Sequence, residues 1–266
     1  MIDIHTHLLF DTDDGVDDIE GTISQIEDAK RIGIETICFT PHYIEPEFIK
    51  DEIQNRKKMD KIKKELKKRN IDINLYLGNE IYISENVNDF LEQQNATTIA
   101  NSDYVLIELP RNIELKNTKE LLERIIYKGK KIIIAHPERY AYVQKNIEYF
   151  NDFIKNGDLY LQGNYGSIIG LYGKDTQKTI IKMIKQKKIH ILASDIHKKD
   201  LYKKIPDILL KLKKIAGQKY INELTQEIPR KIIYNEEIKL SQKSISKFKI
   251  IKIFKNKYWN KKILYI

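Results

Sequence analysis

Histidines and acidic residues gather directly after short apolar segments of this sequence. Five of the six histidines lie in such polar segments, together with four acidic residues. The nine side chains are His5, His7, Asp14, His42, Glu80, Glu108, His136, Asp195 and His197. Imidazoles and carboxylates are typical ligands of Zn, Mn or Fe, whereas a site without a thiolate disfavours Cu(I) and Fe–S clusters. Nine ligands are too many for one ion, so the pattern predicts several ions close together.

A cluster of bridged ions is suited to hydrolysis of phosphate esters. It generates hydroxide near neutral pH and stabilises both the attacking and the leaving oxygen. Arg139 follows His136 by three residues and is a candidate phosphate-binding and catalytic residue, because a guanidinium binds phosphate oxygens with two parallel hydrogen bonds. The alternative for Arg139 is a surface ion pair with Glu138 or another neighbouring acid. The glycine-rich segment 162–173 lacks the spacing of a nucleotide-binding loop and is interpreted as a substrate loop, with loop packing as the alternative.

Several of these residues also have a purely structural interpretation. Asp14 lies in an acidic turn that could simply precede a helix cap. Glu80 and Glu108 follow apolar segments, where an uncompensated carboxylate is unfavourable, so a metal partner is preferred. His190 precedes an apolar segment at its opposite end and is expected to be structural. Cys38, the only cysteine, is expected to be a core residue and not a nucleophile.

Seven short apolar segments alternate with helical patterns along the chain. The predicted strands are Ile2–Ile4, Thr36–Phe39, Ile73–Leu77, Tyr104–Ile107, Lys131–Ala135, Leu159–Gln162 and His190–Ala193. The predicted helices are Val16–Ile32, Glu47–Arg69, Thr118–Lys128, Ile147–Asn156, Lys174–Lys188 and Pro206–Ala216. This alternation predicts an α/β barrel of parallel strands, in which the segments after the strands converge on one rim.

Composition and charge narrow the functional classes. The chain has 266 residues, and no segment is a signal peptide or an apolar run of about 18 residues, so membrane spans and secretion are not expected. A single cysteine favours a cytosolic location. The net charge is +9, but eight lysines and no acids lie in residues 241–266, which leaves +1 for residues 1–240. We therefore expect one domain over 1–240, no nucleic-acid partner, and a basic tail over 241–266 that contacts an anionic membrane, is disordered, or packs on the barrel.

The motifs in their order resemble the PHP (polymerase and histidinol phosphatase) superfamily, and in particular the bacterial PHP-type protein-tyrosine phosphatases of capsule and exopolysaccharide gene clusters. They are His5-x-His7, the Asp11–Gly15 turn, Thr40-Pro-His42, Gly78-x-Glu80, His136-Pro-Glu-Arg139-Tyr and Ser194-Asp195-x-His197. The resemblance implies a distorted (β/α)7 TIM-like barrel, the PHP fold, with a cluster of two to three Mn²⁺ ions for which Fe or Zn could substitute. By this analogy His5, His7, Glu80 and Asp195 form one part of the cluster, Glu108 and His136 a second, and Asp14, His42 and His197 a third. Arg139 matches the phosphate-binding arginine of the family.

The resemblance also implies an activity and a partner. The expected reaction is metal-dependent hydrolysis of phosphotyrosine by in-line attack of a metal-bridging hydroxide, without a phosphocysteine intermediate. The expected substrate is the tyrosine-rich tail of a membrane-associated tyrosine kinase that controls polysaccharide export. The family has a further arginine after the Asp-x-His motif, where this sequence offers Lys203 or Lys204. The alternatives are a small-molecule phosphatase such as a histidinol-phosphate phosphatase, or a non-catalytic docking protein.

Overall fold

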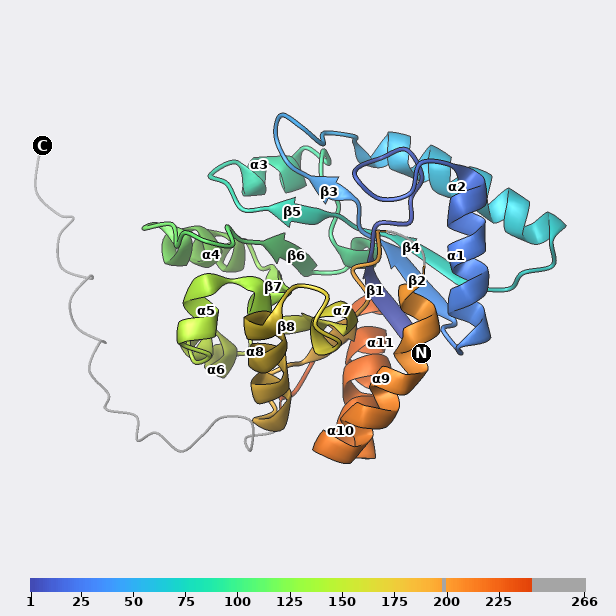
Figure 1. Cartoon of the computed structure of the whole chain (residues 1–266). Helices are drawn as coiled ribbons and strands as arrows, with labels where there is room; N and C mark the ends of the chain where they lie inside the picture. Colours follow the sequence, from blue (N-terminus) through green and yellow to red (C-terminus); the bar gives the residue numbers. More distant parts are fainter. Residues whose placement is uncertain (198–199, 241–266) are drawn as a thin grey trace, which may run out of the picture.

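Parallel strands form the inner wall of the molecule. The computed structural model describes residues 1–197 and 200–240 (Figure 1). Within these residues the strands are β1 (Ile2–Thr6), β2 (Thr36–Phe39), β3 (His42–Tyr43), β4 (Asn74–Leu77), β5 (Glu80–Tyr82), β6 (Tyr104–Glu108), β7 (Lys131–Ala135), β8 (Leu159–Asn164) and β9 (Ile191–Ala193). All of their pairings are parallel.

The wall is divided into two sheets that join at the rim. One sheet has the order β1-β2-β4 and the other β3-β5-β6-β7-β8-β9. The second and third predicted strands are each followed by a further short strand that was not predicted: β3 begins after Thr40 and Pro41, and β5 begins after Gly78 and Asn79. Beyond β9 the chain pairs with β1, because His7 N donates to Ile196 O at 3.0 Å. The expected seven-segment distorted barrel is therefore confirmed.

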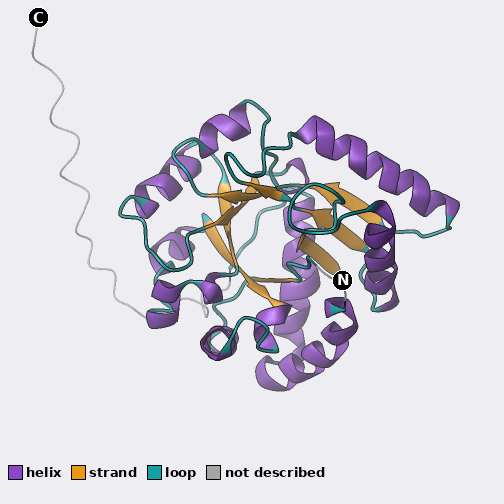
Figure 2. Ribbon diagram, turned by 45° about the horizontal axis from the view of Figure 1, so that its top comes forward, coloured by secondary structure: helices purple, strands orange, loops and turns teal. Residues whose placement is uncertain are grey.

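Helices surround the strands, as Figure 2 shows. They are α1 (Ile19–Arg31), α2 (Glu52–Lys68), α3 (Val87–Glu92), α4 (Thr118–Tyr127), α5 (Ala141–Lys145), α6 (Asn151–Asn156), α7 (Tyr165–Ile168), α8 (Lys174–Lys185), α9 (Leu201–Ala216), α10 (Gln218–Asn222) and α11 (Ile228–Ile233). Short 3-10 turns occur at η1 (Ile99–Asn101) and η2 (Pro137–Arg139), and a π-helical turn, η3 (Glu223–Glu227), joins α10 to α11. None of the helices in 1–197 and 200–240 has the length and apolar character needed to cross a bilayer.

Several helices begin at different residues from those expected. The helix expected from Glu47 begins at Glu52, because Asp51 caps it by accepting from Gln54 N at 2.8 Å. The helix expected from Val16 likewise begins only after Asp18, whose side chain accepts from Gly21 N. In α9 the expected start at Pro206 was wrong, since the helix begins at Leu201 and the proline lies inside it.

The segment from α10 to α11 has no counterpart among the predicted helices and packs against the barrel. Its π-helical turn contacts β1 and β9, while α11 contacts β1. Ile232 and Ile233 join a buried cluster with strand residues such as Ile4, Cys38 and Tyr104. Cys38 is fully buried there, and burial raises the pKa of its thiol. The interior of the barrel is therefore an apolar core next to α11 and becomes polar only toward the other end.

His190 lies just before β9 and is buried in a structural role. Its Nδ1 accepts a hydrogen bond from Leu161 N at 2.9 Å, which requires the neutral ring. Burial, reinforced by the charge of Lys188, lowers the pKa of His190 to about 4. Because the pKa in the unfolded chain is about 6.5, stability is fully present above that pH and is lost as the pH falls from about 6.5 toward 4.

We expect His190→Gln to weaken this pH dependence. Between pH 7 and pH 5 the wild-type chain should lose about 2 kcal/mol more unfolding free energy than the variant, because only the wild-type ring gains a proton on unfolding. Urea unfolding of both proteins at the two pH values measures the difference, and contributions from the other histidines cancel. Equal losses in the two proteins would contradict this role of His190.

Candidate metal centre

All nine predicted ligand residues lie at one end of the barrel. His5 belongs to β1, His42 to β3, Glu80 to β5 and Glu108 to the end of β6. The others lie in the segments that follow β1, β7 and β9. His5 and His7, two residues apart along β1 and its extension, project to the same side, as alternate residues of a strand do. The parallel barrel thus brings together residues that are up to 192 positions apart in the sequence.

One group of four side chains, His5, His7, Glu80 and Asp195, has the spacing of ligands around one ion. Glu80 Oε2 lies 3.3 Å from His5 Nε2 and 3.2 Å from His7 Nε2. Asp195 Oδ1 lies 3.4 and 3.3 Å from the same two nitrogens, which are 3.3 Å apart. Ligand atoms 2.0–2.1 Å from a tetrahedral ion lie roughly 3.3 Å apart. The four atoms can therefore share one ion.

A second group, at the outer side of the first, consists of His7, Asp14, His42 and His197. Asp14 Oδ1 lies 3.3 Å from His197 Nε2 and 3.6 Å from His42 Nε2. The ring of His197 stacks on that of His7, with ring centroids 3.9 Å apart. Asp14, His42 and His197 are the three residues that the resemblance placed together, and His7 joins them here. His7 therefore belongs to two candidate sites.

Glu80 and Glu108 belong to a third group. His42 Nδ1 lies 3.1 Å from Glu80 Oε2, and the ligand atoms of His42, Glu80 and Glu108 are all within 4.8 Å of one another. His136 Nε2 lies 2.9 Å from Glu80 Oε1 and 3.7 Å from Glu108 Oε1. The expected pairing of Glu108 with His136 is present, and the structure adds Glu80 as the carboxylate that all three groups approach.

The hydrogen bonding of this cluster fits bound cations. Glu80 Oε2, Asp195 Oδ1, His42 Nδ1 and His136 Nδ1 are buried and have no hydrogen-bond partner. At His5 burial favours the neutral ring, but the carboxylates of Glu80 and Asp195 outweigh it and raise the pKa to about 9. Burial, followed by the charge of Glu80, raises the pKa of Glu108 to about 7. Excess negative charge of this kind, facing lone pairs of imidazole nitrogens, is what divalent cations neutralise.

A second layer of side chains orients the first, and the sequence did not single these residues out. His7 Nδ1 donates to Asp13 Oδ2 at 2.6 Å, and His42 N donates to the same oxygen at 2.8 Å. His5 Nδ1 donates to Gln162 Oε1 at 2.8 Å. A histidine whose Nδ1 carries the proton presents the lone pair of Nε2. Asp13, next to the predicted Asp14, could have been found from its turn, whereas Gln162 is recognisable only in three dimensions.

Two strand ends adopt left-handed backbone conformations at the site. His136 has φ 32° after β7, and Asp195 has φ 50° after β9. Such conformations are unfavourable for residues with a Cβ and persist where surrounding contacts hold them. Ser194 N donates to Asp3 Oδ1 at 3.0 Å, and Asn164 Nδ2 donates to Asp195 Oδ2 at 2.6 Å. These contacts hold Asp195 turned toward the cluster.

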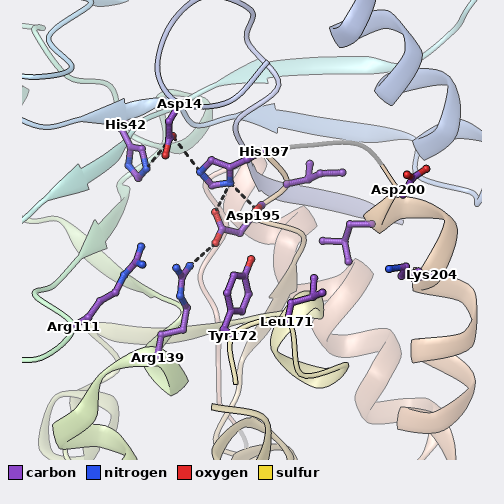
Figure 3. Close-up of a pocket in the computed structure, with 12 residues that line it drawn as sticks. Asp14, His42, Arg111, Arg139, Leu171, Tyr172, Asp195, His197, Asp200 and Lys204 are labelled. Carbon is purple, nitrogen blue, oxygen red and sulfur yellow. Dashed lines mark hydrogen bonds and ion pairs between the residues drawn. The ribbon is translucent and has the colours of Figure 1, made fainter. Parts of the chain in front are cut away.

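A pocket of about 550 Å³ opens beside the cluster (Figure 3). Its lining includes Asp14, His42, Asp195 and His197 together with Arg111, Arg139, Leu171, Tyr172 and Lys204. Arg139 Nη1 donates to Asp195 Oδ2 at 2.9 Å, and its guanidinium lies 4.2 Å from the centre of the Tyr172 ring. The acid with which Arg139 pairs is thus Asp195 and not Glu138, which is buried and accepts from Asn164 N and Ser167 Oγ.

The pocket lining bears on two of the sequence interpretations. Leu171 and Tyr172 belong to the glycine-rich segment 162–173, which therefore does reach the pocket. Lys204 lines the pocket, whereas Lys203 is not among the lining residues and pairs with Asp200 and Asp28. Of the two lysines, Lys204 is thus the one placed to meet a bound anion. Arg111, which no sequence motif singled out, lines the same pocket.

Comparison with known proteins gives consistent results. Residues 1–234 match the family described as capsular polysaccharide synthesis, CpsB/CapC. The chain is 31% identical to the tyrosine-protein phosphatase YwqE of Bacillus subtilis over 197 residues, which cover 74% of this chain and 77% of YwqE. It is 29% identical to the tyrosine-protein phosphatase CpsB of Streptococcus agalactiae over 247 residues, covering 90% of this chain and all of CpsB.

Solved structures agree with the fold. A chain from the crystal structures of YwqE from Bacillus subtilis and CpsB from Streptococcus pneumoniae, described as metal-dependent tyrosine phosphatases, superposes with a TM-score of 0.83. That match has 28% identity and covers 90% of this chain and 96% of the other. A phosphotriesterase homology protein from Escherichia coli shares the barrel at 13% identity, with a TM-score of 0.55 and coverage of 86% and 96%. The resemblance found in the motifs is confirmed, and the chain belongs to the CpsB/CapC family of capsular polysaccharide synthesis.

Proposed function

We propose that this chain is a metal-dependent tyrosine-protein phosphatase. The observation that carries the proposal is the convergence of two imidazole nitrogens and two unpartnered, buried carboxylate oxygens beside an arginine-lined pocket. The names of the related YwqE and CpsB proteins support the same activity. A complete set of ligating side chains also argues against the non-catalytic docking protein considered above.

Different residues of the chain would have different roles in hydrolysis. The nine histidine and carboxylate side chains would hold two to three ions, and when bound these supply activated water near neutral pH and neutralise charge on the phosphate. Asp13 and Gln162 keep the protons of His7 and His5 on Nδ1, so that both Nε2 atoms face the cluster. Arg139, held by Asp195, would bind the phosphate and stabilise the charge on its oxygens during transfer.

The donor set leads us to propose Mn²⁺ as the resident ion, with Fe or Zn as alternatives. Every candidate ligand is an imidazole nitrogen or a carboxylate oxygen, and no thiolate is near. Such donors suit Mn²⁺ as well as Fe and Zn, while they disfavour Cu(I). Metal analysis of the purified chain distinguishes among these ions.

We propose a phosphotyrosine on a protein as the substrate, namely the tail of a membrane-associated tyrosine kinase. The supporting feature is an apolar element at the pocket: Leu171 is 54% exposed and, with Tyr172, offers a surface for an aromatic ring. The proposal places the chain in the cytoplasm, near such a kinase. The alternative of a small-molecule phosphatase such as a histidinol-phosphate phosphatase gains no comparable support from the lining.

Metal removal should abolish activity, because the proposed reaction depends on bound ions. We expect a chelator to stop hydrolysis of an aryl phosphate and Mn²⁺ to restore it. His136→Ala should lower kcat/KM by more than about 100-fold, since even partners outside the ligand shell are worth about 10–100-fold. Cys38→Ser serves as the control and should retain most activity, because its thiol lies in the apolar core. Equal inactivation of the two variants would point to thiolate chemistry instead.

Arg139→Lys tests the phosphate role of the arginine. The lysine keeps the positive charge but loses the planar fork, so kcat should fall by about 100-fold while the unfolding free energy changes little. Steady-state kinetics with an aryl phosphate and urea unfolding measure the two effects. Wild-type kinetics in this variant would reduce Arg139 to an ion-pair partner of Asp195.

Residues 241–266 lie outside those the structure describes, and we propose that they contribute peripheral membrane contact. Their eight lysines alternate with apolar and aromatic residues, a composition suited to an anionic lipid surface. A variant ending at Leu240 should keep its metals and its aryl phosphatase activity but lose sedimentation with anionic vesicles at low salt. Failure of the full chain to sediment would contradict membrane contact, and failure of the shortened chain to fold would place the tail in the core.

A further inference from the structure

Arg111 is a second guanidinium at the pocket and is absent from the motifs that define the site. It lies in the loop between β6 and α4, two residues after Leu109, and lines the same pocket as Arg139. Figure 3 shows the ends of both arginine side chains directed toward the part of the pocket that holds His42 and Asp195. We propose that Arg111 binds the phosphate group of the substrate together with Arg139, an inference that rests on the proposed phosphatase function.

The two arginines are held in related ways. Asp195 presents Oδ1 to the histidines and accepts from Arg139 Nη1 through Oδ2. Glu108 faces His136 and accepts from Arg111 Nε at 3.3 Å and Arg111 Nη2 at 3.1 Å. Each guanidinium is thus tethered to a carboxylate of the candidate metal cluster. A phosphate bound at the cluster would meet both.

Arg111 retains donors for a ligand. Within the described residues, the only hydrogen-bond partner of its guanidinium is Glu108 Oε1, which engages Nε and one terminal nitrogen. The other terminal nitrogen is left to the pocket, and the side chain is 48% exposed, compared with 11% for Arg139. A guanidinium has five N–H donors, so Arg111 can keep its bond to Glu108 and still donate to a phosphate oxygen.

Backbone contacts fix the spacing between the two arginine loops. Ala141 N donates to Arg111 O at 2.8 Å, only two residues after Arg139. Leu109 N donates to Tyr140 Oη at 2.9 Å, and that hydroxyl donates to Ala135 O at 2.7 Å. The loop after β6 and the loop after β7 are therefore joined at Leu109 and at Arg111 itself. The two loops therefore lose their conformational entropy when the chain folds, and little further entropy is lost when a phosphate binds.

The proposed contact is with the phosphate itself and not with the rest of the substrate. A phosphate monoester carries nearly two negative charges at neutral pH, and two guanidinium groups match that charge and its several acceptor oxygens. The alternatives are that Arg111 only neutralises Glu108, or that it recognises an acidic residue beside the phosphotyrosine. Each of these three roles predicts a change in a different measured quantity.

The test compares full-chain, metal-loaded Arg111→Ala and Arg111→Lys with wild type, using inorganic phosphate as the probe. Calorimetric titration gives phosphate affinity, elemental analysis gives bound metal, and kinetics with an aryl phosphate give KM and kcat. Arg124→Ala is the matched control, because Arg124 is 53% exposed and paired with Glu120 on α4. We expect Arg111→Ala to weaken phosphate binding about tenfold at unchanged metal content, Arg111→Lys to recover part of the loss, and Arg124→Ala to match wild type.

Three results would overturn the proposal. Unchanged phosphate affinity in Arg111→Ala would exclude the contact outright. A loss of metal with phosphate affinity restored by added metal would make Arg111 a partner of Glu108 alone. Unchanged phosphate affinity with slower turnover only of acid-flanked phosphotyrosine peptides would assign it to the substrate chain. If the wild-type protein does not hydrolyse phosphotyrosine but its phosphate affinity still depends on Arg111, the proposed function fails and the contact stands.

Discussion

Buried negative charge at the rim of the barrel is the constraint on which the other features depend. Glu80 and Asp195 each direct one oxygen into a space shared with histidine nitrogens, and neither of those oxygens accepts a hydrogen bond from the described residues. A buried carboxylate without such compensation is strongly unfavourable, so the site is complete only with cations. The left-handed backbone at His136 and Asp195 is one consequence, since it turns these side chains inward at the ends of their strands.

The same carboxylates connect the cluster to the pocket. Asp195 lies between His7 and Arg139, and Glu108 lies between His136 and Arg111. Hydrogen bonds donated to Asp13 and Gln162 fix the proton positions of His7 and His5 from the outer side. Ligand geometry and substrate contacts are therefore not independent: a change in either carboxylate alters an ion site and an arginine at once. Polar networks of this kind are effective only when every member is satisfied.

Local patterns in the sequence predicted the barrel, and the structure brings the nine predicted ligand residues together at one end of it. Short apolar strands such as Lys131–Ala135 are easily recognised, and each is followed by its polar residues. Residues whose roles depend on long-range neighbours could not be found in this way. In the sequence Gln162 is only the last residue of a predicted strand, and its role becomes visible when the fold places His5 beside it. Arg111 belongs to no motif. Helix α2 begins later than expected because Asp51 caps it. Helix propensity alone does not show which residue will act as the cap. The π-helical turn before α11 likewise reflects packing under the barrel and not a sequence signal.

The division of the barrel wall has a consequence for how the protein is held together. His5 and His7 belong to β1 and its extension, on the three-stranded sheet, whereas His42, Glu80 and Glu108 lie on the six-stranded one. Ions at the rim would therefore cross-link the two sheets along their seam, next to the β1–β9 contact that closes the wall. Metal bound at such a seam would contribute to the folding free energy as well as to catalysis. The supply of metal in the cell would then govern not only the activity of the protein but also how long each molecule survives.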